Sequence, residues 1–168
     1  MPESIFFYSV ATIAIISAIC VITCKNPINS ALSLVLTFFC LAVFYVMLHA
    51  PFLAAVQVMV YAGAIMVLII FVIMLLNIQA ETVKKSAHGV VLGGAIGFVI
   101  LCETGYLLLS GAISESRGPI DLALIANIGH TELIGMAMFS DFLLPFEITS
   151  LLLLAAIIGA VVLAKKKV

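Results

Sequence analysis

Five long apolar runs, separated by short polar breaks, dominate this chain. Each run is long enough to cross a bilayer as a helix, and none alternates apolar and polar residues as a membrane strand does. The pattern predicts an all-α integral membrane protein with five transmembrane helices, forming one membrane domain over residues 1–168. The helices are expected at residues 5–24, 31–48, 52–76, 89–109 and 143–164, with an outer loop at 110–141.

The short breaks contain residues that begin or end helices. Asn26 and Pro27 disfavour continuation of the first helix, and Asn29 or Ser30 is expected to cap the second. Pro51 is well placed at the start of the third helix. Because so few residues separate them, the second and third helices are predicted to form a tight antiparallel hairpin.

The third run carries two polar groups, Gln57 and Tyr61, one helical turn apart and without a charge nearby. As a straight helix, residues 52–76 would measure roughly 38 Å against a bilayer core of about 30 Å. The surplus length predicts tilt or a backbone irregularity, which would cost least at the small residues Ala62, Gly63 and Ala64. On a regular helix Gln57, Tyr61 and Ala64 would face one neighbour, where they would orient water or hold helices together.

Composition agrees with a membrane protein and excludes a nucleic-acid partner. Hydrophobic residues make up 65% of the chain and charged residues 9%, and the mean hydropathy is +1.40. The formal net charge is −1, and no basic stripe interleaved with aromatic residues occurs. Glu3 stands where a signal peptide would carry a basic residue, so the first span is expected to be retained.

The basic residues predict an orientation in the membrane. Arg117 alone lies on the side of the outer loop, which includes an apolar run, DLALIANIG, expected to form a short interfacial helix. The N-terminus is therefore predicted outside and the C-terminus in the cytoplasm. The basic residues expected on the cytoplasmic side are Lys25, Lys84, Lys85, Lys165, Lys166 and Lys167.

No pattern for a metal, nucleotide or covalent site occurs in the sequence. The cysteines lie inside apolar runs, without a CxxC pair or an adjacent histidine, and are interpreted as packing residues. Neither HExxH, GxSxG, a phosphate-binding loop nor GxGxxG is present. The chain is therefore expected to bind no cofactor of its own. The cysteines are Cys20, Cys24, Cys40 and Cys102.

Two acids lie within the apolar runs. A carboxylate in mid-membrane costs about 2.5 kcal/mol or more, so such residues often line a proton or cation path. Glu103, in the fourth run, is expected to face a partner or a wet cavity. Glu147, near the start of the fifth, fits a place on such a path and equally a hydrated helix start.

Two further groups fit helix packing and membrane anchoring. Gly89, Gly93 and Gly97 repeat every four residues, a pattern that allows close approach of another helix. Beyond the third helix, Glu81 lies close to Lys84, Lys85 and His88. This group is typical of a solvated anchor at the lipid headgroups, and Glu81 is also retained as a candidate for the proton path.

Two strings carry a family resemblance. They are NPINSALSLVLTFFCLAVFYVMLHAPFLAAVQVMVYAGAIMVLIIFVIMLLN and DFLLPFEITSLLLLAAIIGAVVLAKKK, which together make up close to half of the chain. Both resemble the subunit J family of bacterial NADH-quinone oxidoreductase, respiratory complex I, whose mitochondrial counterpart is NADH dehydrogenase chain 6. The loop and the fourth helix between the strings match this family only loosely.

The resemblance implies a non-redox subunit of the bacterial inner membrane that couples quinone reduction to proton translocation. Flavin, iron-sulfur clusters and quinone are then expected in partner subunits, and the neighbours are quinone-site and antiporter-like chains. It also implies a π-bulge at Tyr61 to Ala64, and Glu147 occupies the position of the acid in the family's fifth-helix string. Our hypothesis is that the third helix twists around Gly63. Some family members have an acid in place of Gln57, whereas Glu103 lies in the variable part and receives no role from the resemblance.

Two other functions remain open from the residues alone. A subunit of a cation/proton antiporter complex would share the acids within the membrane but would need no quinone-reducing partner. A purely structural assembly subunit would tolerate replacement of Tyr61 and Glu147 without loss of pumping.

Overall fold

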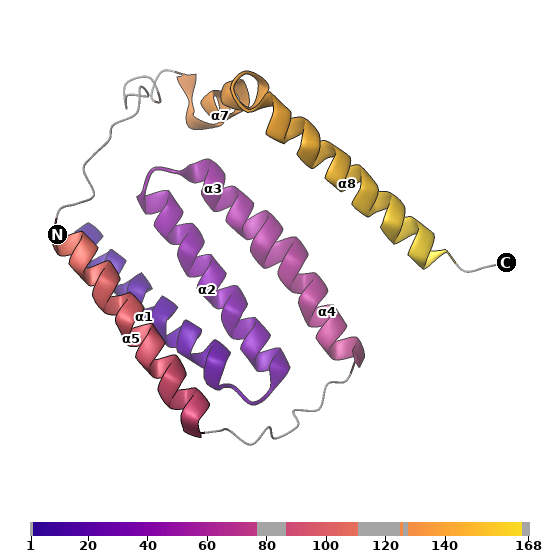
Figure 1. Cartoon of the computed structure of the whole chain (residues 1–168). Helices are drawn as coiled ribbons and strands as arrows, with labels where there is room; N and C mark the ends of the chain where they lie inside the picture. The colour runs from indigo at the N-terminus through magenta and orange to yellow at the C-terminus, as the bar shows by residue number, and fades with distance from the viewer. Residues whose placement is uncertain (1, 77–86, 111–124, 126–127, 166–168) are drawn as a thin grey trace. The chain divides into compact units, whose positions relative to one another are not determined.

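The computed structural model describes residues 2–76, 87–110, 125 and 128–165, and this part of the chain is built from helices without a strand. Within the described residues, five helices are long and apolar enough to cross a membrane, which agrees with the predicted number. The third is continuous from Pro51 to Leu76 but has a π-helical middle. The elements (Figure 1) are α1 (Pro2–Thr23), α2 (Pro27–Met47), α3 (Pro51–Val56), η1 (Gln57–Ile65), α4 (Met66–Leu76), α5 (Ala87–Leu109), α7 (His130–Phe139) and α8 (Leu143–Ala164).

The chain divides into two compact units, Met1–Gly118 and Pro119–Val168. In the first unit α2 is central, since it packs against α1 on one side and against α3, η1 and α4 on the other. In the second unit α7 contacts α8, and the rings of Phe139 and Phe146 lie 4.9 Å apart. Helix α7 falls within the stretch expected to be a loop. Most of the run DLALIANIG lies outside the described residues.

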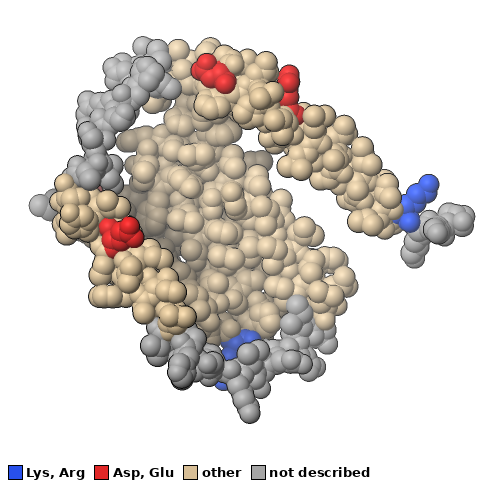
Figure 2. All heavy atoms as spheres, viewed as in Figure 1, with Lys and Arg blue, Asp and Glu red and all other residues tan. Residues whose placement is uncertain are grey.

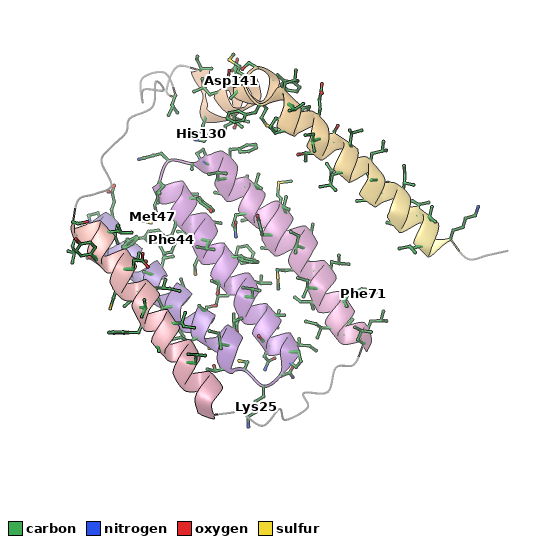
Figure 3. The ribbon with its side chains drawn as sticks, viewed as in Figure 1. Lys25, Phe44, Met47, Phe71, His130 and Asp141 are labelled. Atoms are coloured by element: carbon green, nitrogen blue, oxygen red, sulfur yellow. The ribbon has the colours of Figure 1, made fainter. Side chains whose placement is uncertain are left out.

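The turn between α1 and α2 corrects the expected helix cap. Asn26, not Asn29 or Ser30, is the N-cap of α2, and its side-chain oxygen accepts a 2.9 Å hydrogen bond from the backbone N–H of Ile28. Pro27 fills the first helical position, where its missing N–H costs nothing. The helix therefore begins about four residues earlier than expected. Lys25 lies in this turn (Figure 3).

The turn between α2 and α3 confirms the predicted tight hairpin. Leu48, His49 and Ala50 connect the helices, and Pro51 opens α3 as expected. His49 has a φ of 57°, a left-handed conformation that reverses the chain in a few residues. The N–H of Ala50 bonds back to the carbonyl of Tyr45 at 2.9 Å, which closes the end of α2.

The described surface is mainly apolar and the buried core is small. Figure 2 shows a face on which charged side chains are few. Large apolar side chains such as Ile5, Leu75 and Leu152 are exposed on α1, α4 and α8. This is the distribution expected where lipid or other chains, not water, surround the helices. The buried apolar residues are Val10, Ala31, Cys40, Ala42, Ala54, Ala62 and Met66.

Candidate functional site

The third membrane helix contains a π-helix of nine residues, Gln57–Ile65. At its end the N–H of Met66 is shared between the carbonyls of Gly63 and Tyr61, and the bond to Tyr61 spans five residues, as in a π-helix. Such segments are rare and occur frequently at functional sites. The predicted irregularity is thus confirmed, and it is longer than the Tyr61–Ala64 stretch that the sequence indicated.

The backbone of η1 leaves little room for a side chain at Gly63. A Cβ atom added at Gly63 would lie 3.2 Å from the carbonyl oxygen of Val58, which is tighter than an ordinary contact. Glycine at this position therefore relieves a contact made by the helix's own backbone. Any larger side chain at residue 63 would favour a different local winding of the helix.

The buried side of η1 follows the π-helical spacing. Gln57, Ala62 and Met66 are 7%, 6% and 1% exposed, and they are five and then four residues apart. Tyr61 and Ala64, by contrast, are exposed. The expectation that Gln57, Tyr61 and Ala64 share one face was wrong, because a π turn displaces later residues around the helix relative to an α turn.

Tyr61 is nevertheless held by an aromatic contact to α2. Its ring meets the ring of Phe38 edge to face, with the centroids 5.8 Å apart and the planes at 66°. Such pairs contribute about 0.5–1.5 kcal/mol beyond the area that they bury. The contact therefore stabilises the position of the π-helix against α2. Phe38 could not be singled out beforehand, since one phenylalanine in an apolar helix is ordinary.

Gln57 is a buried amide at the first position of η1. Its side chain makes no hydrogen bond to any residue that the structure describes. The amide atoms themselves are not among the buried polar atoms that lack a partner, so they reach the surface of the chain although the residue is only 7% exposed. A water molecule or a group from another chain can therefore hydrogen-bond to Gln57.

A polar contact fixes α1 to α2. The hydroxyl of Ser17, which is 3% exposed, lies 2.9 Å from the hydroxyl of Thr37 and donates to the carbonyl of Ser33. Thr37 itself donates to the same carbonyl at 3.0 Å. This cluster was not predicted from the sequence. Its signal was a serine and threonine four residues apart on α2 together with a mid-helix serine on α1.

The two membrane acids are exposed in the described structure. Glu103 lies on α5 and Glu147 on α8, and neither has an ion pair with a described residue. Glu103 belongs to the first unit and Glu147 to the second. Glu81 lies outside the described residues. Whether these three acids form a path stays a prediction.

The expected helix-packing glycines and packing cysteines are only partly described. A Cβ atom at Gly93 or Gly97 would meet no atom within 4 Å, while the surroundings of Gly89 are not described. Cys40 is buried, as expected of a packing residue, but Cys102 is exposed on α5. Over the described ranges, no group of three or more His, Cys, Asp or Glu residues could hold a metal ion.

The sequence matches that of a known family. A family model described as NADH-ubiquinone/plastoquinone oxidoreductase chain 6 matches residues 17–163. The match includes η1 and the positions of Glu103 and Glu147. The resemblance found in the sequence is thereby confirmed.

Individual relatives agree over almost the full chain. NADH-quinone oxidoreductase subunit J of Rickettsia typhi is 35% identical over 165 residues, which cover 97% of this chain and 80% of the relative. The chloroplastic NAD(P)H-quinone oxidoreductase subunit 6 of Mesostigma viride is 39% identical over 153 residues, covering 91% and 79%. Subunit 6 from the organellar chromatophore of Paulinella chromatophora is 38% identical over 171 residues, covering 98% and 78%.

Proposed function

This chain belongs to the chain 6 family of NADH-ubiquinone/plastoquinone oxidoreductase, and from that membership we propose that it couples quinone reduction to ion translocation. It acts as a non-redox subunit in the membrane arm of a proton-pumping NADH-quinone oxidoreductase, in the bacterial inner membrane. Flavin, iron-sulfur clusters and the reacting quinone belong to partner subunits. Its membrane neighbours are the quinone-site and antiporter-like chains.

The observation that carries this proposal is the π-helix Gln57–Ile65 in the middle of a membrane-spanning helix. If one turn of η1 converts from π to α, all later residues rotate around the helix axis by about one residue position, which is roughly 100°. Helix α4 would then turn while α3 stays in place. Met66, the most deeply buried side chain, would leave its site against the rest of the bundle.

The surroundings of η1 suit such a change. Helix α2 provides a fixed reference, because the Ser17 contact holds it to α1. Phe38 holds Tyr61 in the π form, and Gly63 permits the crowded backbone. Rotation of the residues after the converted turn would move the Tyr61 hydroxyl relative to the Gln57 amide, which stays with α3. A water path past the two groups would then form in one state and break in the other. This is how a helix without a redox group would gate proton movement.

The experiment compares pumping with electron entry in the assembled complex. Gly63→Val and Tyr61→Phe are expected to lower quinone-coupled proton uptake into vesicles several-fold. Oxidation of NADH by hexacyanoferrate, which bypasses the membrane arm, should stay at the wild-type rate. Matched controls are Gly105→Val and Tyr106→Phe, where a Cβ atom at residue 105 meets nothing within 4 Å and the tyrosine is 71% exposed.

The outcomes separate coupling from a structural role. Normal proton uptake in both η1 variants, in complexes of normal composition, would contradict the proposal and favour a purely structural subunit. Loss of the complex itself in Gly63→Val would be resolved by Tyr61→Phe, which removes one hydroxyl and adds no bulk.

A further inference from the structure

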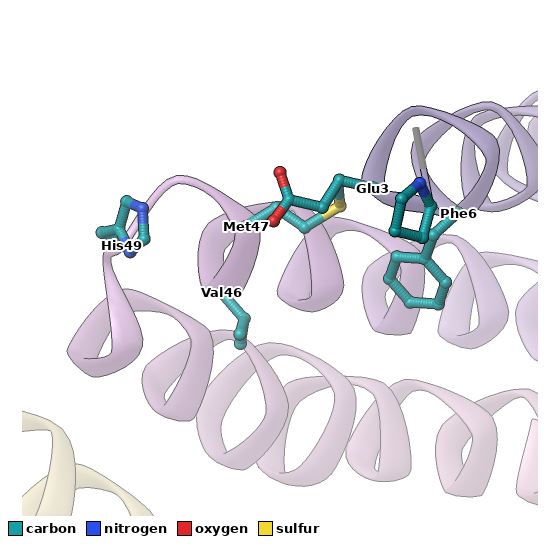
Figure 4. Close-up of a pocket in the computed structure, with 6 residues that line it drawn as sticks. Glu3, Phe6, Val46, Met47 and His49 are labelled. Atoms are coloured by element: carbon teal, nitrogen blue, oxygen red, sulfur yellow. The ribbon is translucent and has the colours of Figure 1, made fainter.

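A pocket of about 390 Å³ opens where α1 begins and α2 ends. Figure 4 shows Phe6 and Glu3 on the side of α1, Met47 beside Glu3, and His49 on the turn that leads to α3. The lining combines one carboxylate, one imidazole and several apolar side chains. Its residues are Pro2, Glu3, Phe6, Val46, Met47 and His49.

A second hollow, of about 360 Å³, lies between α2 and the start of the third helix and is lined by apolar side chains alone. Small residues, among them Ala42 and Ala55, leave the space. Val46 lines both hollows, so the two adjoin on α2. From Val46 to Phe39 the apolar groove follows α2 for roughly 10 Å at 1.5 Å per residue.

The two hollows therefore present a polar end at the helix termini and an apolar groove toward the middle of the spans. We infer that they form one binding site for a phospholipid with an ammonium headgroup, of the phosphatidylethanolamine type. The headgroup lies in the pocket and the upper part of one acyl chain lies in the groove. About 10 Å of groove accommodates much of an acyl chain, since one leaflet of the hydrocarbon core is roughly 15 Å thick.

The charges of the pocket select this headgroup. Glu3 carries the only full charge among the six lining residues when His49 is neutral, and no described residue forms an ion pair with it. A carboxylate next to the exposed ring of Phe6 favours a cation, through charge and through the face of the ring. His49 supplies a ring N–H that can donate to the phosphate. An anionic headgroup without an ammonium would be repelled by Glu3.

Photolabelling of the assembled complex tests this site. The complex is reconstituted in vesicles of phosphatidylethanolamine and phosphatidylglycerol with a trace of a phosphatidylethanolamine that carries a diazirine near the top of its acyl chain. Labelled peptides are identified by mass spectrometry. Labelling of α2 between Phe39 and Met47 is expected, and unlabelled phosphatidylethanolamine should compete more strongly than phosphatidylglycerol.

Separate variants test the headgroup pocket and the acyl-chain groove. Glu3→Gln, which removes the charge, and Ala55→Leu, which fills the groove from an exposed position, should each lower α2 labelling several-fold. Glu3→Asp should retain it. Glu132→Gln is the matched control, because it also removes an acid from the first turn of a helix, here α7. The subunit composition of the purified complex verifies assembly of each variant.

Three results would overturn the inference. Equal labelling in Glu3→Gln and wild type would remove the headgroup assignment, and equal competition by the two lipids would remove its selectivity. Labelling absent from wild-type α2, with crosslinks to another polypeptide instead, would assign the pocket to a basic side chain of a partner subunit. The test does not depend on whether the third helix couples to pumping.

Discussion

The ring of Tyr61 meets the ring of Phe38 edge to face, with the centroids 5.8 Å apart, and this contact joins the π-helix to α2. Tyr61 is otherwise 46% exposed, so the contact is an important restraint on its position within the chain. A change in the winding of η1 has to break or move it. The energy of this pair therefore enters the balance between the π and α forms of the third helix.

Phe38→Leu should shift that balance. The variant keeps an apolar side chain but loses about 0.5–1.5 kcal/mol of aromatic contact, which is up to about a tenfold change in an equilibrium. We expect a lower ratio of protons taken up to NADH oxidised. The matched control is Phe44→Leu, which removes an aromatic pair with Phe7 between α1 and α2. Equal effects of both variants would show that η1 is not specifically involved.

Ser17→Ala should weaken the pairing of α1 with α2. The variant removes a buried hydroxyl that contacts Ser33 and Thr37, and interhelical hydrogen bonds in membranes contribute about 1 kcal/mol. The melting temperature of the purified complex, or its yield if melting is not cooperative, should fall. Ser9→Ala should change neither, since Ser9 is exposed and bonds within its own helix to Ile5.

Asn26→Ala should destabilise the start of α2 by about 1 kcal/mol, because it removes the N-cap hydrogen bond to Ile28. Asn29→Ala tests the alternative cap and should have a much smaller effect. Resistance of the turn to proteolysis in detergent provides the measurement. A larger loss of resistance in Asn29→Ala than in Asn26→Ala would contradict the observed cap.

Glu147→Gln should lower quinone-coupled proton uptake several-fold, since an exposed acid four residues inside α8 is available to a partner or to a water path. Glu132→Gln, on α7, should leave uptake unchanged. Uptake is measured in vesicles and normalised to NADH oxidation by hexacyanoferrate. Unchanged uptake in Glu147→Gln would favour a helix-start role for this acid.

The five spans were predictable because long apolar runs without charges have few other structures in a membrane. The start of α2 was misjudged, since the Asn26–Pro27 pair was interpreted only as a break although it also caps the next helix. Helix α7 was missed because Gly135 interrupts its ten residues and its apolar run is short. Length alone does not distinguish it from a loop.

The position of the site along the chain could be predicted from the sequence, but its geometry could not. Surplus length and the small residues around Gly63 indicated an irregularity in the third helix. Its nine-residue extent and the burial of Gln57 with Ala62 arise from packing against α2, which a single helix pattern does not encode. The Phe38 contact and the Ser17 cluster join residues more than fifteen positions apart, so local spacing could not identify them.

The central claim is that residues 57–65 change their winding during turnover. The most direct measurement is a structure of the assembled complex at rest and another during NADH-driven quinone reduction, compared at the backbone hydrogen bonds of η1. We predict π bonds in one state, including Met66 N–H to the Tyr61 carbonyl, and α bonds with a rotated α4 in the other. The same π-helix and the same buried Met66 in both states would contradict the account.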